Sequence, residues 1–117
     1  MSEYLTTSEA SQYLKVTQRV IARWVIDGNL PNYNTKDPNN LQEESFKISP
    51  YDVLKIANKK RTVKQAAKIL GIKEASLRQQ MSRGAIAYIK INGGSYIYDI
   101  EIKSYRKFRG ELFLKKL

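Results

Sequence analysis

The chain contains no cysteine and no histidine. Without cysteine it cannot form a disulfide, a thiolate metal site or a thiol nucleophile. Without histidine it lacks the side chain that most often acts as general base and that most often binds zinc through nitrogen. It also has neither a glycine-rich phosphate loop nor an obvious cluster of inward-facing carboxylates. We therefore expect a protein that is not an enzyme and that holds no metal and no cofactor.

Long apolar runs are also missing. No segment approaches the roughly 20 apolar residues that a membrane-spanning helix needs. The first ten residues, MSEYLTTSEA, have neither the basic region nor the apolar core of a signal peptide. We expect no membrane partner and a cytoplasmic location.

Positive charge is concentrated in the second half of the chain. The 117 residues include 21 Lys and Arg against 11 Asp and Glu, a formal net charge of +10. Residues 1–56 hold six basic and seven acidic side chains, whereas residues 57–117 hold 15 basic and four acidic ones. A field of this sign attracts polyanions, nucleic acid first among them. The same composition also suits a well-solvated surface, so charge alone leaves both interpretations open.

A repeated pattern links the two halves. Residues 6–30 align without a gap with residues 62–86, at an offset of 56 residues. Few residues are identical, but most apolar positions keep their character, and Gly28 coincides with Gly84. A chance alignment rarely keeps both the periodicity and the glycine, so we predict two copies of one supersecondary unit.

The sequence of each copy predicts two short helices separated by a turn of a few residues. In the first copy, Thr6 is a predicted N-cap with Glu9 at the capping-box spacing, and Thr17 caps the second helix. Gly28 ends that second helix. A helix that stops and restarts within so few residues indicates a helix-turn-helix. The equivalent residues of the second copy are Thr62, Gln65, Lys73 and Gly84, of which Lys73 is a poor cap.

The apolar periodicity predicts the buried faces of these helices. The predicted inner stripe of the first helix is Ala10, Tyr13 and Leu14 in the first copy and Ala66, Ile69 and Leu70 in the second. The predicted inner stripe of the second helix is Val20, Ile21, Trp24 and Val25 in the first copy and Ser76, Leu77, Gln80 and Met81 in the second.

An extended return follows each helix pair. In residues 86–100 apolar and polar side chains alternate around Asn92-Gly93-Gly94, which is a strong hairpin signal. The return of the first copy, residues 31–49, is seven residues longer and rich in Asn, Pro and Asp. A closing helix comes next, with Ser49 as its cap in the first copy and Asp99 in the second.

Together these elements predict a mostly α fold with small β-hairpin wings, built as two tandem winged helix-turn-helix units. We place the first unit at residues 1–58, the second at residues 59–107 and a C-terminal tail at residues 108–117.

The segment LTTSEASQYLKVTQRVIARWVIDGNLP, residues 5–31, resembles the winged helix-turn-helix of excisionase-type and MerR-type DNA-binding domains. The similarity rests on the Thr cap, Ala at the helix crossing, Leu-x-Val-Thr in the turn, Arg-Trp in the second helix and Gly-x-Leu-Pro before the wing. Residues 62–86 followed by KINGGSYIY resemble the same unit, although Lys73 and Gln80 depart from its pattern. The match covers roughly residues 4–56 and 61–107.

The resemblance implies a small DNA-binding protein. Members of this kind are transcription regulators, or factors that bend DNA for a recombinase during excision of phages and mobile elements. Effector-sensing members carry a long C-terminal dimerisation helix and a ligand domain. Only about ten residues follow the second unit here, so we expect neither.

In such a fold the second helix enters the major groove, and its exposed N-terminal residues meet base edges. Arginine can bind guanine at two points, and glutamine can do the same with adenine. The outward positions are 18, 19, 22, 23 and 26 in the first copy and 74, 75, 78, 79 and 82 in the second. Ordinary solvated helix residues would show the same pattern. The predicted base-reading residues are Gln18, Arg19, Arg23, Arg78 and Gln79.

Other polar and basic residues are expected to contact phosphates, which supply affinity without sequence information. We therefore expect the basic second copy to anchor the protein and the neutral first copy to contribute more through specific contacts. The basic run at 59–61 also suits a solvated linker. The predicted backbone and wing residues are Thr17, Lys36, Lys47, Lys59, Lys60, Arg61, Lys64, Lys73, Lys90, Asn92 and Ser95.

These expectations describe a sequence-specific double-stranded DNA-binding protein of a mobile element, an excision factor or transcription regulator that reads adjacent major-groove segments with two recognition helices. The alternatives are an accessory factor for plasmid transfer or partition, and a protein–protein adaptor built on winged helices. Candidate protein partners are a recombinase, a relaxase or RNA polymerase. We expect a nucleoid-associated monomer or weak homo-oligomer, with cooperative binding to DNA as one option.

Overall fold

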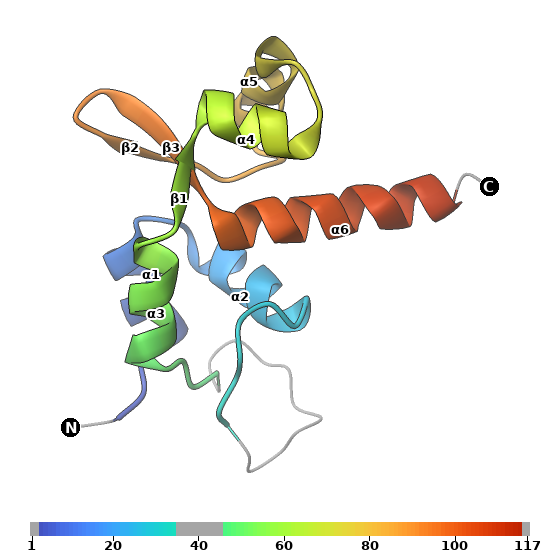
Figure 1. Ribbon diagram of the computed structural model, residues 1–117. Helices are drawn as coiled ribbons and strands as arrows, with labels where there is room; N and C mark the ends of the chain where they lie inside the picture. The colour runs from blue at the N-terminus through green and yellow to red at the C-terminus, as the bar shows by residue number, and fades with distance from the viewer. Residues whose placement is uncertain (1–2, 35–45, 116–117) are drawn as a thin grey trace. The chain divides into compact units, whose positions relative to one another are not determined.

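The computed structural model describes residues 3–34 and 46–115, with side chains described as far as residue 107. These residues form six α-helices and one three-stranded antiparallel sheet, so the fold is mostly helical. The chain divides into two units, Met1–Asn58 and Lys59–Leu117, which we call unit 1 and unit 2. Figure 1 shows the course of the chain through both units.

Three helices of unit 1 surround a small apolar core. Trp24, Leu14 and Ile21 are fully buried there. Outside the helices, Leu5 and Ile48 pair through two backbone hydrogen bonds of 2.7 and 3.0 Å. The helices are α1 (Thr7–Leu14), α2 (Gln18–Ile26) and α3 (Pro50–Ala57).

Side-chain caps start these helices where the sequence predicted them. The Thr6 hydroxyl accepts the backbone N–H of Glu9 at 3.1 Å, and the Glu9 carboxylate accepts that of Thr6 at 3.0 Å. Thr17 accepts the N–H of Val20, and Ser49 caps α3. Each cap satisfies a helix N–H that would otherwise lack a partner, which confirms the predicted helix starts.

Unit 2 combines three helices with the sheet, whose strand order is β1-β3-β2. Asn92 and Gly93 form the two-residue turn between β2 and β3, and both have positive φ, 50° and 85°. This geometry confirms the predicted hairpin. Figure 1 shows the hairpin extending beyond α4. The elements are β1 (Lys60–Thr62), α4 (Val63–Leu70), α5 (Glu74–Ser82), β2 (Ile89–Ile91), β3 (Gly94–Tyr98) and α6 (Asp99–Lys115).

The core of unit 2 lies where α4, α5, β3 and α6 meet. Ala66 and Ala67 on α4 are small, so α5 can cross α4 closely. The other buried side chains of this core are Val63, Leu77, Met81, Ile86, Ile97, Ile102 and Tyr105.

The ends of the helices have the same backbone geometry in both units. Lys15 and Gly71 end the first helices in the left-handed region, with φ of 59° and 69°. Gly28 and Gly84 follow the second helices with φ of 80° and 75°. The sequence repeat at an offset of 56 residues is therefore also a repeat of local structure.

The extended returns repeat as well. Beyond the seven extra residues of unit 1, the offset becomes 49, that is 56 minus 7. At these offsets, backbone pairs of unit 1 correspond to pairs in the sheet of unit 2. The equivalent pairs are Leu5–Ile48 with Arg61–Ile97, and Tyr33–Lys47 with Ile89–Tyr96.

Two predicted core positions on the first helices are wrong. Tyr13 and Ile69 are 55% and 41% exposed. The prediction counted apolar residues only and therefore passed over Thr7 and Ser11, which are buried. Ser11 tolerates burial because its hydroxyl donates a hydrogen bond to the Ser8 carbonyl. The observed stripes are Thr7, Ala10, Ser11 and Leu14 in α1, and Val63, Ala66, Ala67 and Leu70 in α4.

The second helices need two further corrections. Ser76 of α5 was predicted to face inward but is exposed, because α5 buries only Leu77 and Met81, one turn apart. Ala22 of α2 was predicted to face outward but is 2% exposed. The buried stripe of α2 is wide enough to include this small side chain. The predicted burial of Trp24 is confirmed.

The last helix differs from its prediction at both ends. Asp99 was expected to cap α6, but it is the first helical residue, and its carboxylate contacts the Arg61 guanidinium at 2.9 Å instead. Residues 108–117 were predicted to be a tail, whereas α6 continues to Lys115. Only Gly110 opposes helix formation in a segment otherwise rich in good helix formers.

A buried carboxylate ties the return segment of unit 2 to α6. Glu101 is 1% exposed, and its Oε2 accepts the backbone N–H of Ala87 at 2.6 Å. The equivalent residues of unit 1 are Asp52 and Pro31. Proline has no N–H to donate, and Asp52 Oδ2 is buried without a hydrogen-bond partner among the described residues.

The left-handed backbone at Lys15 predicts a stabilising substitution. A residue with a Cβ costs roughly 1–2 kcal/mol in this backbone region, and glycine avoids that cost. Part of the benefit is lost because glycine gives up more backbone entropy on folding. Lys15→Gly should therefore raise the free energy of unfolding by about 0.5–1 kcal/mol, measured by urea denaturation with the fluorescence of Trp24 as the probe. Lys15→Ala removes the same charge but keeps a Cβ, so it should not stabilise. Equal stabilisation by both changes would contradict the backbone explanation.

The Glu101 contact predicts a destabilising substitution. Glu101→Ala leaves the Ala87 N–H without its acceptor and should lower the free energy of unfolding by about 1–3 kcal/mol. Glu101→Gln keeps an acceptor oxygen and should cost less. Asp52→Ala is the matched change in unit 1 and should be the mildest of the three, since no N–H is lost. Circular dichroism during urea denaturation measures all three, and equal losses at Asp52 and Glu101 would count against this role.

Candidate nucleic-acid interface

Helix α5 turns a wide polar face to solvent. Of its nine residues only Leu77 and Met81 are buried, and the helix is held chiefly by α4. Lys73, at the cap position before it, makes no capping hydrogen bond with its side chain, as its poor capping chemistry predicted. The residues of the exposed face are Glu74, Ala75, Arg78, Gln79 and Ser82, the outward set predicted from the sequence.

Arg78 is held by an acidic neighbour one turn earlier on the same helix. Its Nη2 lies 3.2 Å from Oε1 of Glu74. Both side chains are about half exposed, so the pair contributes little to stability. The contact restricts the direction in which the guanidinium points. It uses only one of the five N–H donors of the guanidinium, so the others remain available to a ligand.

The β2–β3 hairpin places several predicted contact residues close together. Lys90 on the edge strand β2 is exposed and lies directly opposite Ser95 on β3. Asn92 is exposed at the turn. Two neighbouring strands and their turn thus bring these three polar side chains to one end of the hairpin.

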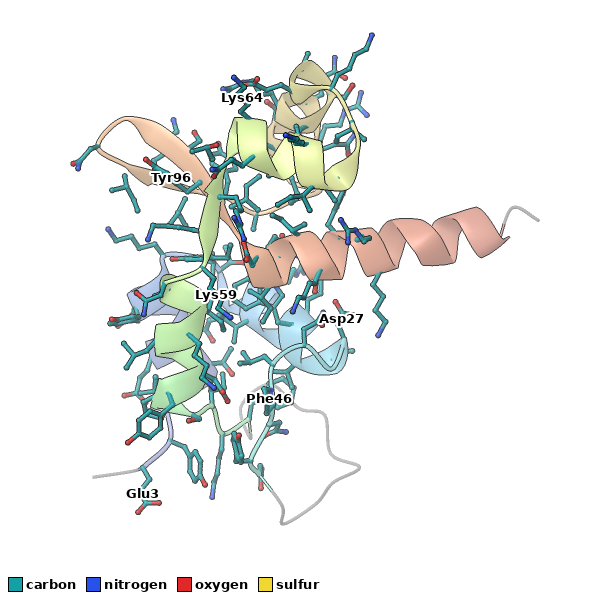
Figure 2. The ribbon with its side chains drawn as sticks, viewed as in Figure 1. Glu3, Asp27, Phe46, Lys59, Lys64 and Tyr96 are labelled. Carbon is teal, nitrogen blue, oxygen red and sulfur yellow. The ribbon has the colours of Figure 1, made fainter. Side chains whose placement is uncertain are left out.

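A second basic segment leads into α4. Lys59, Lys60, Arg61 and Lys64 are all exposed. Figure 2 shows Lys59 just before β1 and Lys64 at the start of α4. Because β1 is an edge strand, positive charge there also prevents pairing with the edge of another molecule. Lys60 and Arg61 on β1 therefore have a structural role that does not depend on any ligand.

Arg61 is the least available of these cations. Its Nε and Nη2 donate to the two carboxylate oxygens of Asp99 at 2.9 and 3.3 Å. This hydrogen bonding, together with the negative charge of Asp99, raises the pKa of the Arg61 guanidinium above its usual value. The charge of Arg61 is thus permanent but largely balanced by its neighbour.

The acidic side chains described in unit 2 are all engaged. Glu74 contacts Arg78, Asp99 contacts Arg61, and Glu101 is buried. The exposed ionic surface is consequently dominated by cations. Several of these exposed cations were not among the predicted contact residues. The charge imbalance of residues 57–117 indicated an excess of basic residues there but did not single out individual ones. They are Lys68, Arg83, Lys103, Arg106 and Lys107.

In unit 1 the structure separates the predicted residues. Gln18 and Arg19 are exposed at the start of α2. Arg23 was predicted to lie on the free face, but it is half-buried and its Nε is inaccessible to solvent. The wide buried stripe of α2 explains this, as it explains Ala22. Thr17 is exposed and uses its hydroxyl as the helix cap.

The remaining predicted residues of unit 1 lie in the return segment. Lys47 is exposed, and its backbone pairs with Tyr33 and with the Asn32 side chain. Lys36 lies outside the described residues. The predicted interface of unit 1 is therefore represented by fewer exposed side chains than that of unit 2.

Among the described side chains, residues 3–34 and 46–107, there is no group of three or more acidic residues placed to bind a metal ion. In the same part of the chain, every helix is too short or too polar to cross a membrane.

Comparison of the chain with models of known protein families, with curated proteins and with solved structures finds no match in any of the three.

Proposed function

We propose that the protein binds double-stranded DNA in a sequence-specific manner through two tandem winged helix-turn-helix units. In each unit the second helix, α2 or α5, serves as the recognition helix. The hairpin β2–β3 serves as the wing of unit 2. In a mobile element such a protein acts as an excision factor or a transcription regulator, with a recombinase or RNA polymerase as its protein partner.

The exposed face of α5 is the observation that carries this proposal. A helix that buries only Leu77 and Met81 and offers Arg78 and Gln79 to solvent has the shape and donors needed in a major groove. The groove admits one α-helix, and an arginine there can bind guanine at two points.

The cations around α5 support the proposal. The solvent-accessible acids described in unit 2 are paired with arginines, so the surface attracts phosphates with little opposition. Lys90 on the hairpin and Lys64 at the start of α4 are exposed and suit contacts to the DNA backbone. These contacts supply affinity, while α5 supplies sequence information.

One observation favours the adaptor as a second candidate function for unit 1. Tyr51 and Leu54 on α3 are 78% and 47% exposed and lie three residues apart, on one face of the helix. Tyrosine is enriched in protein interfaces. If the chain is such an adaptor, its winged helices bind a partner protein, the basic half serves solubility, and no salt-dependent binding to DNA is observed.

Salt dependence tests the proposal. If about six phosphates are neutralised, the logarithm of the association constant should fall against the logarithm of salt concentration with a slope of about −5. Fluorescence anisotropy with a labelled 30-base-pair duplex between roughly 50 and 300 mM salt measures the slope. A slope near zero would remove DNA from the proposed function.

A pair of lysine substitutions tests where the phosphates bind. Lys90→Ala should make the slope less steep by about 1, since one phosphate contact is lost. Lys55→Ala removes an equally exposed lysine from α3 of unit 1 and should leave the slope unchanged. The same anisotropy titration measures both variants. Equal effects would show that the slope reports overall charge rather than contacts of the hairpin.

A further inference from the structure

We propose that α5 alone supplies base discrimination, with Arg78 reading guanine and Glu74 positioning Arg78. On this view α2 adds affinity without comparable discrimination. The inference rests on the proposed DNA binding and reverses the division of labour that net charge suggested, in which unit 1 made the specific contacts.

The repeat allows the two outward faces to be compared position by position. At the middle of the helix, Arg78 of α5 is replaced in α2 by Ala22, and Ser82 by Ile26. Alanine and isoleucine have no hydrogen-bonding group, so they cannot read a base edge by donor and acceptor pattern. The remaining equivalent pairs are Gln18 with Glu74, Arg19 with Ala75, and Arg23 with Gln79.

Exposure leads to the same conclusion. All five outward residues of α5 are exposed. On α2, Ala22 is buried and Arg23 is half-buried, so only Gln18 and Arg19 of the predicted base-reading residues are freely accessible. α2 therefore offers base edges only the polar side chains of its first turn, whereas the exposed polar face of α5 extends from Glu74 to Ser82.

Glu74 restricts the guanidinium of Arg78 before DNA binds. The 3.2 Å contact limits the rotamers of Arg78 before binding, so less freedom is lost when the guanidinium meets a base. This restriction raises the ratio of specific to non-specific binding.

The first step of the test is selection of a preferred site from a pool of random duplexes with the wild-type protein. Arg78→Lys keeps the charge but loses the planar fork that binds guanine at two points. It should lower the preference for one guanine in the selected site by about 10- to 100-fold. Its salt slope and its affinity for unrelated DNA should stay near the wild-type values.

Arg19→Lys is the matched control on α2. It should change the preference at every position of the site by less than about threefold, as a phosphate contact does. A position-specific loss as large as that of Arg78→Lys would show that α2 also reads bases and would overturn the inference.

A double-mutant cycle separates the positioning role of Glu74 from a general effect of its charge. Glu74→Gln should lower the preference for the same guanine by roughly 3- to 10-fold, in proportion to the lost restriction of Arg78. In the Arg78→Lys background it should have no further effect on that preference. Equal effects in both backgrounds would overturn the positioning role, and circular dichroism confirms that each variant is folded.

The outcomes distinguish the inference from the function on which it rests. If wild-type protein shows no salt-dependent binding and yields no preferred site, the proposed function fails. If wild-type protein selects a site and Arg78→Lys discriminates as well as wild type, the proposed function stands and the assignment to α5 fails.

Discussion

Each unit depends on one backbone constraint, the left-handed residue that ends its first helix. At Lys15 and Gly71 the chain leaves the helix with positive φ, and the next residue bonds back to a carbonyl of the same helix. The chain then starts a second helix within a few residues. That second helix can cross the first because Ala10 and Ala66 leave room between the two backbones. The face of the second helix that turns away from the first is the one that we propose binds DNA.

The units share this framework and differ in their surfaces. The capping box of the first helix, the left-handed backbone at its end and most buried positions recur at fixed offsets, because loss of any of these features costs free energy of folding. Exposed side chains contribute far less to stability, so their chemistry can diverge without loss of the fold. Unit 2 has accumulated positive charge, and its α5 carries Arg78 where α2 carries Ala22. Equal architecture therefore does not imply equal roles in binding.

Not all of the positive charge in unit 2 is available to a polyanion. Arg61 is balanced by Asp99, and Arg106 donates a 2.7 Å hydrogen bond to the Ile69 carbonyl, which fixes α6 against α4. The cations of β1 also protect a sheet edge. Lys64, by contrast, has no evident structural task. Counting charges along the sequence treats these groups alike, whereas the contacts distinguish them.

The sequence by itself determined the features that form through short-range hydrogen bonds. The Thr17 cap and the Asn92-Gly93 turn involve residues at most three positions apart, so local chemistry sets them. Only the tertiary structure decided which side chains are covered. Ser11 is buried although polar because it lies on the packed stripe of α1, and Tyr13 is exposed because it lies beside that stripe. The contact of Glu101 with a distant backbone N–H likewise exists only once the return segment meets α6, since nothing along the chain marks two groups that far apart as partners.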